Sequence, residues 1–409
     1  MSHDDADRPA GDASTGTSDA TDTESDGQRR LSRRGLLRSA AGAGYGLGVA
    51  ALLGVDEFLA ASDETVTIET ALVRPDPTDH NTLERRTKEV PGRWYSAVSR
   101  AIELHDRISD VSVPGYVGSA VVPGPHESGS ARITLGVDAD EFTSLPGDIA
   151  ELIPQLDVDW ENPLDGISID VDHVGGVDEL EADAPEPAEP RRVSGADVDP
   201  VPGGVRCETP ESSATLTPAI YHPDLDGPAF ATAWHAYIDV DQAVGEPLYL
   251  PTADNDRPRI GEVVDAFRPA DVAVARPIDG YRPGSVLDGA SVDGVAGQYT
   301  TWGLADLVAR NVELESVGGT SSRSRGEIQA IHALSCVRPD RCRYDQVRWG
   351  SERNMSDGDS GSVCYNPEPE IADGALVVSV NVARTWWPGQ DHVWGIAADE
   401  LTRRHGYHF

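Results

Sequence analysis

Apolar residues alternate with polar ones, or recur at helical spacing, throughout residues 65–174. Alternation predicts four strands in this region, at Thr65–Val73, 116–122, 131–137 and Ile167–Val174. Apolar residues spaced three and four apart predict an amphipathic helix over residues 93–108. A second, shorter helix is expected at residues 148–153, where Pro154 would stop it.

The order of these elements predicts a small α/β domain over residues 63–175, with the strand–helix–hairpin–helix–strand arrangement of a ferredoxin-like sandwich. Residues 176–203 are rich in proline, alanine and acids, which predicts a stiff and solvated linker. Residues 204–409 contain many short apolar runs separated by Gly, Pro and Asp, as in an all-β barrel or sandwich. The expected fold class is therefore mainly β, preceded by a small α/β domain.

The N-terminal residues predict a targeting signal rather than a folded domain. Residues 1–28 are polar and almost free of large apolar side chains, so we expect them to be disordered. The arginine pair Arg33-Arg34 precedes a charge-free run at residues 39–55, which predicts a twin-arginine export signal over residues 29–62. The export machinery would then be a partner, and the protein would act outside the cytoplasm, either extracellular or in the cell envelope. No clean cleavage motif follows, so an uncleaved signal would tether the protein to the membrane.

The charge balance excludes some partners. The chain has 409 residues, with 70 Asp and Glu against 33 Lys and Arg, and a formal net charge of −37. A nucleic-acid binder or a polybasic membrane-surface protein needs a basic face, so both classes are excluded. Lys88 is the single lysine. A dense carboxylate surface that avoids lysine suits strong brine, where salt screens the self-repulsion, and it predicts a halophile's protein.

The cysteines could form disulfides, but their spacing does not indicate a metal site. Export makes disulfides possible for the four cysteines, which are Cys207, Cys336, Cys342 and Cys364. Three pairings are possible and the sequence does not choose among them, although Cys336 and Cys342 could close a small loop. No cysteine–histidine spacing indicates zinc. We expect neither a metal nor an organic cofactor.

The sharpest local motif is a serine between glycines. It consists of Asp357, Gly358, Asp359, Ser360, Gly361 and Ser362. Glycines permit positive φ, so a tight turn of this kind can expose a serine hydroxyl. The same turn can aim amide N–H groups at an atom that becomes an oxyanion. By itself, the motif is also typical of a surface turn.

Two further motifs precede the serine along the chain. His235 follows an apolar run in a Thr-Ala-Trp-His context, and Asp271 opens an alternating apolar strand. The three motifs, in this order within an all-β segment, resemble those of the chymotrypsin-like serine peptidases. The resemblance extends to a glycine-punctuated strand pair at residues 317–328, and it covers about half of the chain, residues 204–409. It does not cover the N-terminal α/β domain.

The resemblance implies a double β-barrel and a catalytic triad. Ser360 would attack the scissile carbonyl of a protein or peptide substrate, His235 would accept and return the proton, and Asp271 would orient the imidazole. The N–H groups of Gly358 and Ser360 would form the oxyanion hole. One strand would line the substrate site with three residues: Ser379, Val380 and Asn381.

Several residues leave alternatives open. Trp234 stands where the family has a small residue, and crowding there would favour a catalytically inactive binding or cell-surface protein. His222 and His332 lie near apolar runs but lack the context of His235, and Asp265 ranks second to Asp271 as the triad acid.

The residues before Val193 raise the question of activation by cleavage. In animal relatives, cleavage after a basic residue frees an α-amine that pairs with the aspartate before the serine, here Asp359. Arg191 and Arg192 precede Val193, but a charged linker is the favoured interpretation. Asp359 would be buried, so it needs either a cation or several hydrogen bonds. The expected function is that of an exported, halophilic serine endopeptidase.

Overall fold

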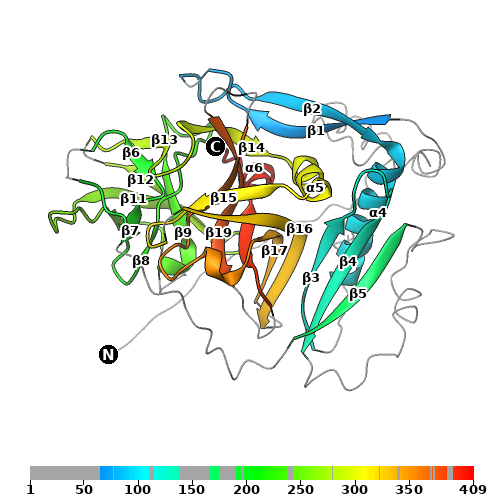
Figure 1. Ribbon diagram of the computed structural model, residues 1–409. Coiled ribbons are helices and arrows are strands. Elements are labelled where there is room, and N and C mark those ends of the chain that lie inside the picture. The colour runs from blue at the N-terminus through cyan, green and yellow to red at the C-terminus, as the bar shows by residue number, and fades with distance from the viewer. Residues whose placement is uncertain are drawn as a thin grey trace, which may run out of the picture. The chain divides into compact units, whose positions relative to one another are not determined.

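The computed structural model describes residues 65–76, 78–109, 115–138, 166–174, 190–194, 198–237, 243–278, 280–321, 323–338, 341–368, 371, 374–384 and 390–409 (Figure 1). The predicted disordered N-terminus, the export signal and the predicted helix at residues 148–153 lie outside the described residues. Most of the predicted linker also lies outside them. The described chain is mainly β.

Six antiparallel strands form a closed ring in the C-terminal part of the chain. Each strand pairs with two neighbours, in the order β15, β16, β17, β20, β19, β18 and back to β15. The strands are β15 (Glu313–Val317), β16 (Arg323–Arg338), β17 (Arg341–Trp349), β18 (Val363–Pro367), β19 (Gly374–Arg384) and β20 (Val393–Ala397). The apolar run of β19 is buried along nearly all of its length. This ring is the second barrel of the molecule.

A six-stranded antiparallel sheet precedes the second barrel, in the order β8, β7, β10, β11, β12, β9. The strands are β7 (Arg206–Glu208), β8 (Ser213–Thr215), β9 (Phe230–Ala233), β10 (Pro247–Tyr249), β11 (Arg259–Phe267) and β12 (Val272–Pro277). The segment that follows β8 meets β9 through a hydrogen bond from Thr217 N–H to the Ala231 carbonyl, and it meets the residue before β9 through a bridge between Ile220 and Ala229. These contacts roll the sheet into the first barrel, around a core that includes Phe230, Trp234, Tyr237, Leu248 and Ile260.

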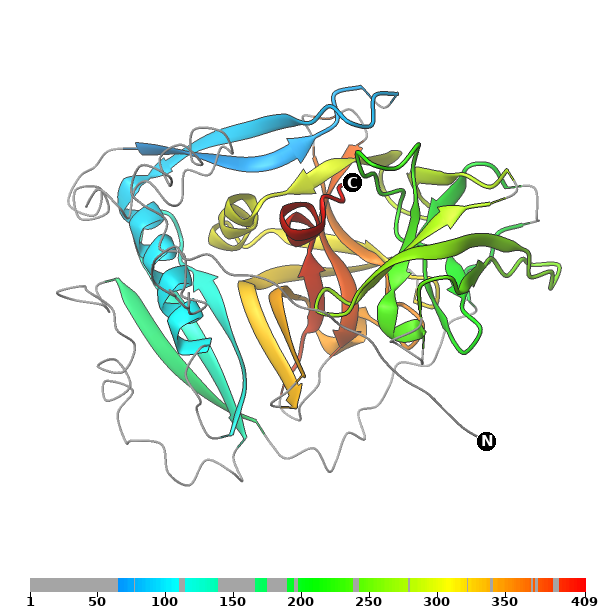
Figure 2. The ribbon, with the colours of Figure 1, turned by 180° about the vertical axis from the view of Figure 1, so that it is seen from behind.

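The α/β segment contains the expected strands and its first expected helix. It comprises β1 (Thr65–Val73), β2 (Glu84–Pro91), α4 (Gly92–Ser109), β3 (Tyr116–Pro123), β4 (Ala131–Asp138) and β5 (Ile167–Val174). β3 pairs antiparallel with β4, and β4 pairs parallel with β5. α4 lies against these strands (Figures 1 and 2), and its buried side chains Trp94 and Leu104 share a core with Ile133 of β4. The strand β2 was not predicted, because its residues are mostly charged.

The expected ferredoxin-like arrangement is wrong. β1 does not pair with β3, β4 or β5; it pairs with β2 and with β14 (Gly294–Tyr299). β3 pairs with β16, and β14 pairs with β19. Strands of the α/β segment and of the second barrel therefore belong to one hydrogen-bonded 12-stranded sheet. Alternation in the sequence located the strands, but it carries no information about which distant strand each one pairs with.

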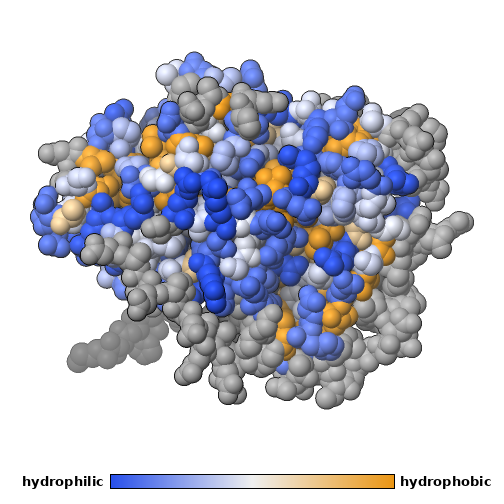
Figure 3. Space-filling view, viewed as in Figure 1, coloured by the Kyte–Doolittle hydropathy of each residue, from blue (hydrophilic) through white to orange (hydrophobic). Residues whose placement is uncertain are grey.

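The remaining described elements connect and cover the barrels. They are β6 (Val201–Gly203), which pairs parallel with β13 (Pro283–Leu287), the helices α5 (Thr301–Ala309) and α6 (Ala398–His405), and the 3-10 helices η4 (Trp234–Ala236) and η5 (Glu352–Asn354). Hydrophilic residues cover most of the face seen in Figure 3, and apolar residues form small separate patches on it. Among the described residues, no helix is long and apolar enough to span a membrane.

Candidate active site

Three side chains from three separate segments form a hydrogen-bonded chain. His235 Nδ1 lies 2.8 Å from Asp271 Oδ2, and His235 Nε2 lies 3.0 Å from Ser360 Oγ. His235 and Asp271 belong to the first barrel, whereas Ser360 lies in the turn that leads into β18 of the second. The structure thus brings together the three residues that the sequence motifs singled out. Both distances are within the range of a hydrogen bond.

The pairing of β9 with β12 places His235 beside Asp271. Ala233, at the end of β9, is opposite Val272, at the start of β12. His235 therefore begins the turn after one strand, while Asp271 ends the turn before the other. Two backbone donors fix the aspartate: Trp234 N–H donates to its carbonyl at 3.0 Å, and His235 N–H donates to Oδ1 at 2.9 Å. Asp271 is fully buried and has a φ of +52°, a left-handed conformation that aspartate tolerates.

Trp234 does not occupy the space between the histidine and its partners. Its side chain is buried in the core of the first barrel, with the guanidinium of Arg268 5.8 Å from its ring. His235 consequently reaches both Asp271 and Ser360. The crowding that would have favoured an inactive protein is absent from this part of the described structure.

The turn around Ser360 depends on its glycines. Gly358 and Gly361 have φ values of +96° and +93°, which only glycine adopts at low cost. A Cβ atom on Gly361 would lie 2.3 Å from the Thr215 carbonyl oxygen. Among the described residues, the N–H groups of Gly358 and Ser360 have no hydrogen-bond acceptor. Both amides are therefore available to an external oxygen atom.

Asp359 is satisfied by hydrogen bonds rather than by a cation. Its buried carboxylate accepts from the N–H groups of Thr320, Ser321 and Ser356, at 2.8, 3.0 and 2.8 Å, and from the Ser321 hydroxyl. Carboxylates that accept several backbone N–H bonds need no ion pair for their burial. The three donors from Thr320 and Ser321 hold the Ser360 turn against the segment that follows β15.

The segment before the first barrel is docked rather than free. Val193 is buried and bridges to Thr252, and its carbonyl accepts a hydrogen bond from Ala253. Arg191 N–H donates to the Gly319 carbonyl, and its guanidinium pairs with Asp288. The uncleaved chain already gives Asp359 four hydrogen-bond donors. These donors take the place of the α-amine that cleavage before Val193 would free.

The prediction for the substrate-lining strand needs a correction. The side chains of Ser379, Val380 and Asn381 are 0 to 1% exposed, so none of the three is open to a substrate. Asn381 Nδ2 donates to the hydroxyls of Ser316 and Ser362, and its Oδ1 accepts from Trp349. The Asn381 carbonyl accepts from Gly361 N–H, which brings the strand alongside the Ser360 turn only at this residue. The part of β19 that continues past the turn is residues 382–384, where Arg384 pairs with the exposed Asp357.

Arg343 is a site residue that the sequence did not reveal. Its Nη2 atom lies 2.7 Å from Asp271 Oδ2, and its side chain is 17% exposed. Arg343 comes from β17 in the second barrel, next to Cys342, so no local pattern connects it to the first barrel. The Asp271 carboxylate thus has two partners on one oxygen, the His235 imidazole and the Arg343 guanidinium.

The competing candidates lie in other environments. Asp265 accepts a hydrogen bond from the Tyr407 hydroxyl, and the ring of His222 also packs against Tyr407. His332 Nε2 and Nδ1 lie 2.7 and 2.8 Å from the carboxylates of Asp106 and Asp345. None of these three residues takes part in the hydrogen bonds of Ser360.

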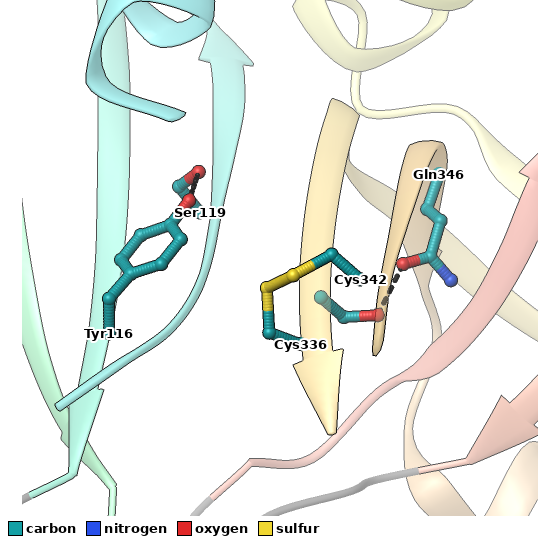
Figure 4. The surroundings of a disulfide bond; sticks show 6 residues. Tyr116, Ser119, Cys336, Cys342 and Gln346 are labelled. Carbon is teal, nitrogen blue, oxygen red and sulfur yellow. Dashed lines mark hydrogen bonds between the residues drawn. A yellow bond between two sulfur atoms is a disulfide. The ribbon is translucent and has the colours of Figure 1, made fainter. Parts of the chain in front are cut away.

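One disulfide clasps the β16–β17 hairpin. Cys336 and Cys342 face each other in the register of the two strands and are bonded. Figure 4 shows this bond beside Gln346 of β17, near the strand that carries Tyr116 and Ser119. The other two cysteines, Cys207 and Cys364, are free and buried. Burial raises the pKa of both thiols, to about 12 for Cys207, so neither is a nucleophile at neutral pH.

Comparisons with known proteins find similar solved structures but no similar family model or curated sequence. No family model matches the chain, and no curated protein matches it in sequence. Solved structures that resemble it include a glutamic acid-specific serine protease, a Nocardiopsis protease and a chymotrypsin of Cellulomonas bogoriensis, with 15, 16 and 16% identity and TM-scores of 0.37, 0.37 and 0.35. Each match covers 51% of this chain and 96 to 99% of the solved chain. The strands themselves confirm the predicted fold class: the described chain is mainly β, and two antiparallel barrels follow the α/β segment.

Proposed function

We propose that the protein is a serine endopeptidase that hydrolyses peptide bonds through an acyl-enzyme. The observation that carries this proposal is the continuous chain of hydrogen bonds from Ser360 through His235 to Asp271. His235 Nε2 accepts the hydroxyl proton as Ser360 Oγ attacks the carbonyl carbon, and later returns the proton to the leaving amine. The buried carboxylate of Asp271 orients the ring and stabilises its charged form.

The N–H groups of Gly358 and Ser360 would form the oxyanion hole of this reaction. Both are unpartnered among the described residues and lie on the same turn as the nucleophile. They would donate to the carbonyl oxygen as it becomes an oxyanion, where one lost donor typically costs ~3 kcal/mol of transition-state stabilisation. Water then hydrolyses the acyl-enzyme with His235 as the base. No step requires a metal or an organic cofactor.

We further propose that the protein is exported and works in strong salt. The arginine pair before the charge-free run supports the export, and the net charge of −37 with a single lysine supports the halophilic setting. Lys88 itself pairs at 2.7 Å with the buried carboxylate of Asp306, so the single lysine serves the protein's own structure.

Hydrolysis of an unfolded protein substrate in high salt tests the proposed activity. The wild-type chain and a Ser128→Ala control should cleave the substrate, because Ser128 lies in an exposed turn of the α/β segment. Ser360→Ala should lose the activity while keeping the same circular dichroism spectrum. Equal cleavage by Ser360→Ala and wild type would overturn the proposed mechanism. Fractionating a culture of the source cells would test export separately: the protein should be found in the medium or the envelope, and a cytoplasmic location would refute it.

A further inference from the structure

The carboxylate of Asp271 is shared between an imidazole and a guanidinium from different barrels. His235 Nδ1 lies 2.8 Å from Oδ2, and Arg343 Nη2 lies 2.7 Å from the same oxygen. Asp271 is fully buried, so water screens neither interaction effectively. A permanent cation on this oxygen weakens the attraction between the carboxylate and a protonated imidazole. Arg343 therefore acts on the base through the acid that orients it.

The β16–β17 hairpin determines where this guanidinium lies. Arg343 follows Cys342 directly and faces Ser335 in the register, while Cys342 faces Cys336. The disulfide joins the two strands one residue from Arg343. Three residues after Arg343 the strands are joined again, by the hydrogen bond from the Ser335 hydroxyl to the side-chain oxygen of Gln346. The hairpin is thus fixed on both sides of the arginine.

We infer that Arg343, held in place by the Cys336–Cys342 clasp, is a positioning residue that keeps His235 in its neutral, proton-accepting form at lower pH than the triad alone would allow. The inference rests on the proposed peptidase function. Its physical basis is local, because the guanidinium contacts a fully buried carboxylate that salt screens far less than surface charges.

Other charged groups around the site do not replace Arg343. From the turn before β12, the guanidinium of Arg268 lies over the Trp234 ring rather than on the carboxylate. From the Ser360 turn, Asp357 pairs with Arg384 of β19, and the carboxylate of Asp359 accepts hydrogen bonds from residues 320, 321 and 356. The guanidinium of Arg343 is the charged group in contact with Asp271.

The rate of phosphonylation by a fluorophosphonate probe, measured against pH, tests the inference. Arg343→Met removes the charge but keeps the length of the side chain, and Arg343→Lys restores a charge. The acid limb of the profile should move to higher pH by about one unit in Arg343→Met, and by less in Arg343→Lys. At a pH below the limb, that shift corresponds to about a tenfold slower reaction. Arg132→Met, which alters an exposed ion pair of the α/β segment, should leave the profile unchanged.

The disulfide supplies the second arm of the experiment. A Cys336→Ser, Cys342→Ser double variant should move the acid limb in the same direction, and it should have no further effect when combined with Arg343→Met. An unshifted limb in Arg343→Met would overturn the inference, as would a disulfide effect of equal size with and without Arg343. A lower plateau rate with an unshifted limb also overturns it, because that pattern indicates only a structural role. Absence of labelling in the wild type would instead refute the proposed peptidase function.

Discussion

A charged histidine, His332, links the α/β segment to the second barrel. Its replacement should destabilise the fold by an amount that depends on pH in a predictable direction. His332 lies on β16 between two carboxylates, Asp106 of α4 and Asp345 of β17, at 2.7 and 2.8 Å. Burial opposes the charge, but hydrogen bonds and attraction from the two aspartates outweigh it and raise the pKa of His332 to about 9. The neighbouring His105 has a lowered pKa because of burial, so it stays neutral beside this pair.

The raised pKa makes folding stability depend on pH. A rise from 6.5 to about 9 corresponds to roughly 3 kcal/mol of stabilisation of the folded state. Because the folded pKa lies above the unfolded one, this stabilisation is complete below pH 6.5 and is lost as the pH rises through about 9. The side chain of His332 is 17% exposed, so salt screens the interaction only partly.

His332→Asn removes the charge and suits the backbone, since His332 has a φ of +47° and asparagine tolerates that conformation. Denaturant unfolding of both proteins in high salt measures, at pH 6 and at pH 10, the difference in the free energy of unfolding between the variant and the wild type. The variant should be less stable at pH 6, and the deficit should shrink by roughly 3 kcal/mol at pH 10. A deficit of the same size at both values would show that the packing of the ring, rather than its charge, stabilises the fold, and would refute the reasoning.

Three further substitutions test the site and the core. Asp271→Asn should lower kcat by about 10⁴-fold without unfolding the chain, because the amide cannot hold the required tautomer of the histidine; a loss below tenfold would contradict its role. Gly358→Ala should slow fluorophosphonate labelling by about 10²-fold, because the Cβ would lie 2.5 Å from Thr320 Oγ1 and the φ is +96°; an unchanged labelling rate would count against the oxyanion hole. Trp94→Ala should lower the free energy of unfolding by about 3 to 5 kcal/mol, because it empties the core beneath α4; a loss under 1 kcal/mol in denaturant unfolding would refute that packing.

Local motifs predicted the site better than they predicted the surrounding sheet. His235, Asp271 and Ser360 each sit in a short segment whose residues determine its own turn, and the barrel architecture then brings the segments together. β1, by contrast, was located by its alternation but pairs with β14, more than two hundred residues away. The alternation specifies which face of a strand is buried and leaves its partner undetermined.

Two features of the site were predicted wrongly or missed, the substrate-lining residues and Arg343. Both have the same physical origin as the undetermined partner of β1. Position relative to Ser360 placed Ser379 beside the substrate, but β19 meets the Ser360 turn at Asn381 and continues past it with residues 382–384. Arg343 could not be found by motif, because it is one arginine among many and reaches Asp271 only across the interface of two barrels. The course of β19 past the Ser360 turn and the contact of Arg343 with Asp271 both depend on the long-range pairing of strands.

The central claim is that Ser360 is a nucleophile activated by His235. Intact-mass and peptide mass spectrometry after exposure to a fluorophosphonate in high salt tests it most directly. The folded protein should gain one phosphonyl group, carried by the peptide that contains Ser360, and the Ser360→Ala variant should gain none. A folded protein that stays unmodified, or a group found on another residue, would contradict the account.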